Sequence, residues 1–398
     1  MSTQMKLQDR PRRGAVALVA GMTALLLVAG AGGAAAQTVT GTVAHGQQIT
    51  ISGGNYGSAN IGNFIWDDLE DGNADLNATV GTWQSKGDLQ AMSNHNRSGN
   101  SSFHAGVNFT NEMWACFKGG NDAPKWYVQY WFYLDNDFNF SGNIDNSLGN
   151  IKIFRMWSTG NGSNNLRLQF LADWESDLVV EIVDQGHDWN PVIPGTSWID
   201  QVMGHSAPDW VDPGGLGWRN YSDDVTKGSW HLFQFEYQES SLNNFDGHMR
   251  WWFDGKLILN RTDVRTRTSA EPSSMRPNTV GWYNSHSANA DGNDHFYLDD
   301  VYISPTWARV ELGNASSYSA CTRREIQLPV SWGTSSVTVN VNAGAFNAGD
   351  NAWVYVVRDD GTVVNGGQVT IGASGGGGGG DDPPPGPPGQ PGIVGDGS

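Results

Sequence analysis

Cysteine and basic residues are both scarce in this sequence. The 398 residues include only two cysteines, Cys116 and Cys321, which lie 205 residues apart, so the sequence alone does not show whether they meet. Lys and Arg number 23 against 41 Asp and Glu, which gives a formal net charge of −18. An acidic surface repels phosphate backbones, so nucleic acid is not an expected partner.

Helical periodicity is missing between residues 37 and 372, and so are several catalytic signatures. No nucleotide-binding loop and no Ser-His-Asp or Cys-His arrangement is discernible. Instead, short runs of alternating polarity recur between turn residues, for example KWYVQYWFYLD, WHLFQFEYQ and SVTVNVNAG. Recurring strands of this kind, with 52 glycines to supply turns, predict an all-β sandwich.

A long apolar run occurs once, over residues 14–31. Basic residues precede it, and AAAQ offers a small-residue cleavage site after Ala36. This pattern predicts a signal peptide over 1–36 and a secreted or extracellular protein, either free or attached to the cell surface. The alternative is a single membrane anchor, because the run approaches spanning length. No other stretch is long enough, so no membrane span is expected after cleavage.

The last residues, 373–398, have a different composition from the rest. GGGGGG and PPPGPPGQPG cannot bury a core, so this segment is predicted to be a linker or tail. Such a linker suggests a further domain or an anchor beyond it.

Residues 63–305 resemble a known fold family. FIWDDLEDG is similar to the opening strand of concanavalin A-like lectin/glucanase jelly rolls, GHMRWWFDGKLIL to a strand–turn–strand around DGK, and FYLDDVYIS to the closing strand. The resemblance implies a jelly roll whose concave sheet binds glycans.

A second resemblance concerns the segments on either side of the jelly roll. Residues 306–372 resemble the later strands of a TIG-type immunoglobulin-like domain, through VELGN, REIQLPVSW, SVTVNVNAG and NAWVYVV. That family's first strand is missing there, but HGQQITISGGNYGS, within 37–62, resembles it. The sequence therefore predicts one immunoglobulin-like domain, 38–62 plus 306–372, interrupted by the jelly roll. An unpaired N-terminal strand and a separate C-terminal domain are the alternative.

Tryptophan points to a carbohydrate partner, since 15 of the 18 tryptophans lie within 63–305. Flat aromatic rings stack on sugar faces, and strand alternation separates such rings from core residues. In KWYVQYWFYLD, Trp126, Val128, Tyr130 and Phe132 form a predicted core face. The opposite faces of four strands form a predicted polysaccharide-binding surface, with ordinary solvated surface as the alternative. Its residues are Tyr127, Gln129, Trp131, Tyr133, Arg167, Gln169, Gln234, Glu236, His248, Arg250 and Trp252.

Whether the protein is an enzyme stays open. The glucanase branch commonly carries E-x-D-x-E on one strand, which is absent here and weighs against a glycoside hydrolase. A polysaccharide lyase would need a Tyr or His base and a cation or amide to neutralise a uronate, and Arg167 and Arg250 with Lys152 or Arg155 offer such cations. The three hypotheses are a secreted polysaccharide-binding protein, a lyase of an acidic (uronic-acid or sulfated) glycan, and a structural or adhesive surface protein.

Three smaller features complete the set. Acidic clusters in DDLEDGNAD and LDDV predict a structural Ca²⁺ site at Glu70, Asp71, Asp299 and Asp300, with solvated turn carboxylates as the alternative. Cys116 and Cys321 are predicted to form a disulfide, or else to be two buried thiols. The segment 184–224, with His187 and His205, is too long for an idle connection and is expected to form a rim over the sheet.

Overall fold

The computed structural model is an all-β protein, as the sequence predicts. Among the described residues it has strands β1 to β21 and one short 3₁₀ helix, but no α-helix. None of these described residues forms a helix of the length and apolar character needed to cross a membrane. The residues that the structure describes are 37–62, 64–70, 77–83, 85–86, 90–106, 115–118, 124–136, 150–157, 166–172, 178–184, 226–265, 269, 279–285 and 295–372.

The chain divides into two compact units, Met1–Ala34 and Ala35–Ser398. The fold described here is that of the second unit. The predicted signal peptide and the predicted linker, 373–398, lie outside the described residues.

An eight-stranded antiparallel sheet is the main layer of what we call the large sandwich, β3 to β16. Its strand order is β14-β13-β12-β8-β16-β6-β5, and β3 pairs with β16 at the side. The strands are β3 (Ile65–Asp67), β5 (Gln90–Met92), β6 (Ser102–Gly106), β8 (Lys125–Leu134), β12 (Trp230–Gln238), β13 (Gly247–Phe253), β14 (Lys256–Val264) and β16 (His295–Ser304).

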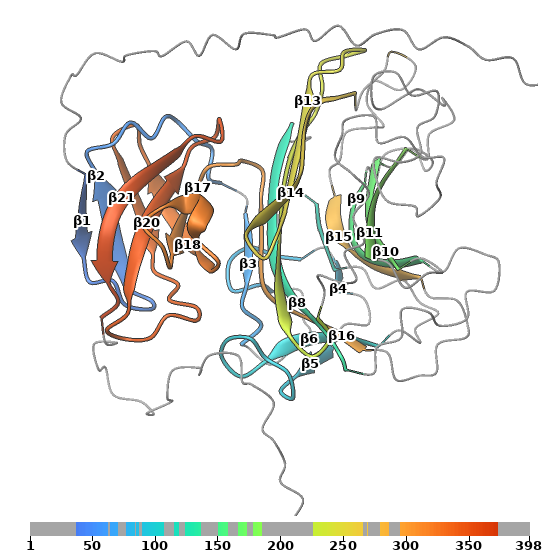
Figure 1. Cartoon of the computed structure of the whole chain (residues 1–398), viewed down its shortest axis with the longest axis horizontal. Helices are drawn as coiled ribbons and strands as arrows, with labels where there is room; N and C mark the ends of the chain where they lie inside the picture. The colour runs from blue at the N-terminus through green and yellow to red at the C-terminus, as the bar shows by residue number, and fades with distance from the viewer. Residues whose placement is uncertain are drawn as a thin grey trace, which may run out of the picture. The chain divides into compact units, whose positions relative to one another are not determined.

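Two smaller sheets complete the large sandwich (Figure 1). One has the order β4-β7-β15-β9, and the other is the pair β10-β11, with β10 lying beside β9. These strands are β4 (Ser85–Lys86), β7 (Ala115–Lys118), β9 (Asn150–Trp157), β10 (Leu166–Ala172), β11 (Leu178–Asp184) and β15 (Thr279–Ser285).

The core of the large sandwich follows the predicted alternation. The predicted inward residues of β8 are fully buried together with residues of β12 and β13, although most residues of the other face of β8 are buried too. An extended strand points successive side chains to opposite faces, so a run of large apolar residues at every second position specifies one buried face. The predicted core residues Trp126, Val128, Tyr130 and Phe132 are buried, and so are Phe233, Phe235, Met249, Trp251 and Phe253 of β12 and β13.

A local signal also fixes the hairpin between β13 and β14. Asp254 and Gly255 have φ of 46° and 75°, so both central residues are left-handed, as in the two-residue turns that match strand twist. Asp-Gly is a favoured pair for such a turn. The DGK hairpin that the sequence predicts is therefore present.

The remaining seven strands form what we call the small sandwich. Their order is β1-β2-β19-β18-β17-β20-β21. They are β1 (Thr38–Gly41), β2 (Gln48–Ser52), β17 (Arg309–Gly313), β18 (Arg324–Trp332), β19 (Ser336–Asn340), β20 (Asn351–Val357) and β21 (Val363–Thr370), with the 3₁₀ helix η1 (Tyr318–Ala320) after β17.

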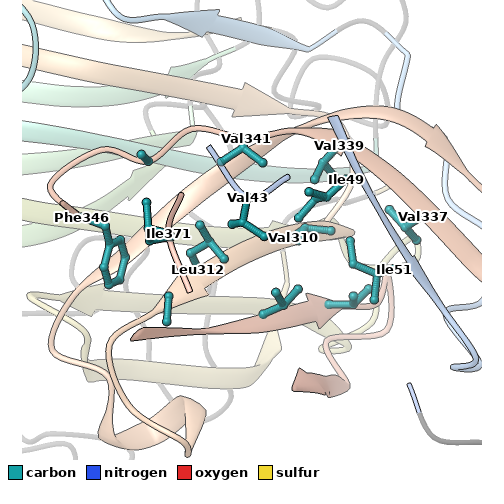
Figure 2. Packing of buried hydrophobic residues seen from close by; sticks show 14 of the residues in the cluster. Val43, Ile49, Ile51, Val310, Leu312, Val337, Val339, Val341, Phe346 and Ile371 are labelled. Atoms are coloured by element: carbon teal, nitrogen blue, oxygen red, sulfur yellow. The ribbon is translucent and has the colours of Figure 1, made fainter. Parts of the chain in front are cut away.

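The early strand β2 pairs with the late strand β19, as predicted for residues 47–53. The antiparallel register sets Ile51 opposite Val337 and Ile49 opposite Val339. These four side chains are buried in one apolar cluster together with residues of β17 and β20, such as Val310 (Figure 2). Segments on both sides of the large sandwich therefore build a single core. The immunoglobulin-like name for this unit stays a prediction.

Candidate functional site

The predicted polysaccharide-binding surface has the expected alternation but is largely covered. Tyr127, Gln129, Gln234 and Glu236 point away from the core of the large sandwich, as predicted, yet none is more than 1% exposed. Side chains of the small sandwich lie on this face. The prediction that these four residues contact a polymer is therefore wrong, because part of the same chain occupies the surface.

Arg309, on β17 of the small sandwich, is the centre of this junction. Its Nη1 lies 2.8 Å from Glu236 Oε1 and its Nε lies 2.6 Å from Glu311 Oε1. The guanidinium lies 4.0 Å from the centroid of the Tyr127 ring. Arg324 adds a second cation, 3.6 Å from Glu311 Oε2, and donates to Gln234 Oε1. Buried carboxylates are tolerated here because each has arginine partners.

Apolar packing accompanies this ionic network. Trp66, Tyr127 and Tyr302 of the large sandwich form one buried cluster with Trp307 and Ile326. The indole Nε1 of Trp307 donates to the main-chain carbonyls of Trp126 and Tyr237, at 3.1 and 3.0 Å. Rings and amides that resembled a glycan-binding face are thus junction residues.

The rim of the junction keeps two of the predicted residues partly accessible and buries a third. Arg250 lies 2.8 Å from Glu236 Oε2, and its side chain is 18% exposed. His248 meets the Trp307 ring edge-on at 5.1 Å and is half-buried, while Trp252 is 9% exposed. Burial, and then the nearby Arg250 cation, lower the pKa of His248. These residues border the junction and do not form one open face.

The predicted residues of β10 lie on a different sheet. Arg167 and Gln169 are in β10, beside β9 with Lys152 and Arg155, whereas Arg250 is in β13 of the eight-stranded sheet. The expectation that Arg167 and Arg250 share a face is therefore wrong. The side chains of Lys152, Arg155, Arg167 and Gln169 lie outside the described residues, as does the segment 185–225 with His187 and His205.

Beyond the junction, the same face of the eight-stranded sheet carries a second cluster, in which Tyr133 and Tyr297 are buried and Trp230 is half-buried. The register aligns Trp230 of β12 with Tyr133 of β8, and Tyr133 with Tyr297 of β16. His95 lies in the connection between β5 and β6. Its ring centroid is 4.7 Å from that of Tyr133, on which it stacks, and 4.6 Å from that of Tyr297. We call His95, Tyr133, Asp135, Trp230 and Tyr297 the His95 cluster.

The His95 cluster brings together a histidine–aspartate pair and two tyrosine hydroxyls. His95 Nε2 lies 3.5 Å from Asp135 Oδ1, and these side chains are 32% and 17% exposed. Burial, and then the Asp135 carboxylate, raise the pKa of Tyr133, which keeps its phenol protonated. Asn94 Nδ2 donates to the Tyr297 hydroxyl at 3.2 Å. A histidine oriented by a carboxylate beside two phenols has the parts for proton transfer.

Sequence reasoning included Tyr133 but missed the other members of the His95 cluster. Trp230 and Tyr297 belong to strands that were predicted, and their alignment with Tyr133 depends on the strand order. His95 reaches them only because residues 93–101 fold back over the sheet. No local pattern in that segment signals the fold-back.

The residues of the predicted calcium site meet a protein segment. The Asp299 carboxylate accepts hydrogen bonds from the amides of Arg97 and Ser98, at 2.8 and 3.3 Å. Glu70 accepts from the next amides, of Asn100 and Ser101, and the Asp300 side chain pairs with Arg97. No group of three or more acidic, His or Cys side chains suited to a metal occurs in the described part of the chain, and Asp71 lies outside it. The calcium site stays a prediction.

The predicted disulfide is not formed at Cys321. This residue is a free, buried thiol whose Sγ lies 3.5 and 3.4 Å from the carbonyl oxygens of Ala315 and Ser317. It belongs to the small sandwich, whereas Cys116 is in β7 of the large one. The pairing prediction is corrected to a buried thiol at Cys321, which is the alternative that the sequence left open for that residue.

Comparisons with known proteins give structural matches only. No protein-family model and no curated protein matches the chain. An endo-β-1,4-glucuronan lyase from the fungus Trichoderma reesei is 16% identical with a TM-score of 0.37, over 63% of this chain and 97% of that one. A marine alginate lyase from Aplysia kurodai is 12% identical with a TM-score of 0.39, and the match covers 62% of this chain and 99% of that one. The binding domain of Paraclostridial Mosquitocidal Protein 1 is 9% identical with a TM-score of 0.32, over 70% and 59%.

Proposed function

We propose that this protein is a secreted polysaccharide lyase that acts on an acidic glycan at the His95 cluster. The observation that carries the proposal is the contact of His95 with Tyr133, Tyr297 and Asp135 on a partly exposed face. The half-buried ring of Trp230 suits stacking on a sugar, and His and Tyr are the residue types that β-elimination requires.

The proposed reaction transfers two protons. His95, oriented by Asp135, accepts the proton from the carbon next to the uronate carboxyl. The electron pair forms a carbon–carbon double bond as the bond to the glycosidic oxygen breaks. Tyr133, kept protonated by its raised pKa, donates a proton to that leaving oxygen. The products are a new chain end and an unsaturated uronate, with no net change in protons.

The uronate charge needs a partner in this proposal. Asn94 offers an amide beside the reacting groups, since its Nδ2 donates to the Tyr297 hydroxyl. Arg97 is close in sequence but is engaged by Asp300 and Glu325. With a net charge of −18 the whole chain repels an anionic polymer, so binding should depend strongly on local cations and on salt.

Non-catalytic binding at the same cluster is the second candidate. It is favoured by Trp230, which is half-buried and whose ring centroid lies 5.6 Å from that of the buried Tyr133. The Trp230 ring offers a stacking surface for a sugar whether or not a proton is transferred. The structural or adhesive alternative gains from the junction, which accounts for many of the aromatic and polar residues without any ligand.

The experiment incubates the mature protein with uronate-containing, sulfated and neutral polysaccharides. It follows the absorbance of unsaturated uronates and retention on polysaccharide gels. Tyr133→Phe and His95→Gln should each lower turnover by on the order of 10²-fold or more. Tyr56→Phe is the matched control, since its hydroxyl contacts Gln37 in the small sandwich.

Each outcome selects one candidate. Product that is lost in both cluster variants and kept in the control supports the lyase. Retention without product, weakened by Trp230→Ala, favours non-catalytic binding. Neither product nor retention on any polymer would leave the structural or adhesive hypothesis.

A further inference from the structure

The segment that carries His95 is held by carboxylates along its length. Asp299 accepts from the Arg97 and Ser98 amides, and the Ser98 hydroxyl donates to Asp300 Oδ1 at 3.0 Å. Glu70 then accepts from the amides of Asn100 and Ser101, at 2.6 and 3.1 Å. The 93–101 connection is therefore anchored to fixed acidic groups, two of them on β16.

Arg97 extends this anchoring to the small sandwich. Its side chain is 5% exposed, and its two terminal nitrogens bind different carboxylates, Asp300 of the large sandwich and Glu325 of the small one. The guanidinium also lies 4.0 Å from the centroid of the Trp131 ring. The rigid fork of an arginine suits such a double contact, which a lysine could not reproduce.

Glu325 is itself fixed within the small sandwich. It lies on β18, opposite Leu312 of β17, and its carboxylate accepts from the Ala345 amide at 3.2 Å. The side chain is 1% exposed, so it cannot follow the 93–101 connection if that segment moves. Gly344 packs tightly on it, because a Cβ there would lie 2.3 Å from the carboxyl carbon. Glu325 is thus a rigid point of attachment.

The backbone of Asp300 shows that this arrangement is strongly determined. Asp300 has φ of 49°, in the left-handed region that few non-glycine residues adopt, and it lies where the β16–β8 register shifts. Such strain persists only where surrounding contacts over-determine the conformation. Here the shift lets both Asp299 and Asp300 face the 93–101 connection.

We propose that Arg97 is a positioning residue, through which Glu325 of the small sandwich holds His95 against Tyr133 and Tyr297. The small sandwich is then part of the site and not a separate attachment. The catalytic consequence of this inference rests on the proposed function of the His95 cluster. The anchoring itself does not, because it is argued from the contacts of Arg97. His95 is two residues from Arg97, so loss of the anchor should loosen the backbone that carries the imidazole.

The test compares Glu325→Gln with wild type in the full mature chain. Amide hydrogen exchange over 94–102 should become faster by on the order of tenfold, with β20 unaffected. Chemical modification of His95 should accelerate in parallel, and kcat should fall more than KM rises. Arg97→Lys should give the same pattern, and Glu325→Asp should restore part of the protection. Asp360→Asn is the matched control, a carboxylate of the small sandwich that pairs with Arg358.

The outcomes separate this inference from the proposed function. Faster exchange and modification with unchanged turnover would keep the anchor and refute the His95 cluster as the active site. Unchanged exchange and unchanged His95 modification in both Glu325→Gln and Arg97→Lys would overturn the inference, whatever happens to activity.

Discussion

Replacing Arg309 by methionine tests whether the ionic junction stabilises the fold. The guanidinium donates to Glu236, Glu311, the Trp307 carbonyl and the Tyr318 hydroxyl, all within 3.0 Å. Breaking a buried ion pair by removing one partner costs about 3–5 kcal/mol, because the remaining charge loses its compensation. Glu236 and Glu311 keep the second arginines described above, so we expect a loss of about 3 kcal/mol, the lower end of that range.

Urea unfolding followed by tryptophan fluorescence measures this loss. Adding Glu311→Gln to Arg309→Met removes one uncompensated charge, so the double variant should recover stability, with a coupling energy of about 1–3 kcal/mol. Arg358→Met, at a partly exposed pair with Asp360, is the control and should cost less than about 1 kcal/mol. A loss below about 1 kcal/mol for Arg309→Met, or strict additivity with Glu311→Gln, would refute the reasoning.

Further predictions concern buried groups elsewhere. Burial, and then Asp300, raise the pKa of Asp299 well above its usual range, so its protonation favours the folded state. That stability is present below the usual value of 3.8 and is lost as pH rises through the raised value. The stability of wild type relative to Asp299→Asn should therefore fall as the pH is raised above 3.8, and a constant difference would contradict this. Trp251→Ala should cost about 3–5 kcal/mol in urea unfolding, since the side chain is fully buried, and a benign effect would mean that the faces are reversed. Mass spectrometry should find Cys321 unlabelled by a thiol reagent until the protein unfolds. Calcium should raise the melting temperature and Asp300→Ala should abolish that rise, whereas identical curves in chelator and in calcium would end the calcium hypothesis.

Period-two alternation made much of the fold predictable. It separated Trp126 from Tyr127 correctly, because neighbouring residues of an extended strand must face opposite ways. The Asp254–Gly255 turn was equally local, since few residue pairs accept two left-handed conformations. The pairing of residues 47–53 with a late strand was predicted from a different observation. Residues 306–372 resemble the later strands of a domain whose first strand is missing there.

Period-two alternation does not predict which part of the molecule covers a given strand face. A buried ionic junction uses the residue types of a wet binding surface, so Gln234 and Glu236 fitted either role. The sequence of the small sandwich did carry a signal that this face is covered. On β17, Arg309 and Glu311 alternate with Val310 and Leu312 of the small core, which marks a second, polar face needing a partner. His95 gave no comparable signal, because its position depends on tertiary contacts far away in the sequence.

The pairing of β2 with β19 also sets an order of events during folding. Ser52 lies opposite Ser336, so the first strands of the small sandwich wait for almost the whole described chain before they meet their neighbour. A lone β1–β2 hairpin is at best marginally stable in water, and closing so long a loop is slow. If the large sandwich folds first, it brings the two ends of its own segment together and shortens the effective loop. The small sandwich would then assemble last, on a completed scaffold, and a chain stopped before β19 would expose an unpaired β2 edge to aggregation.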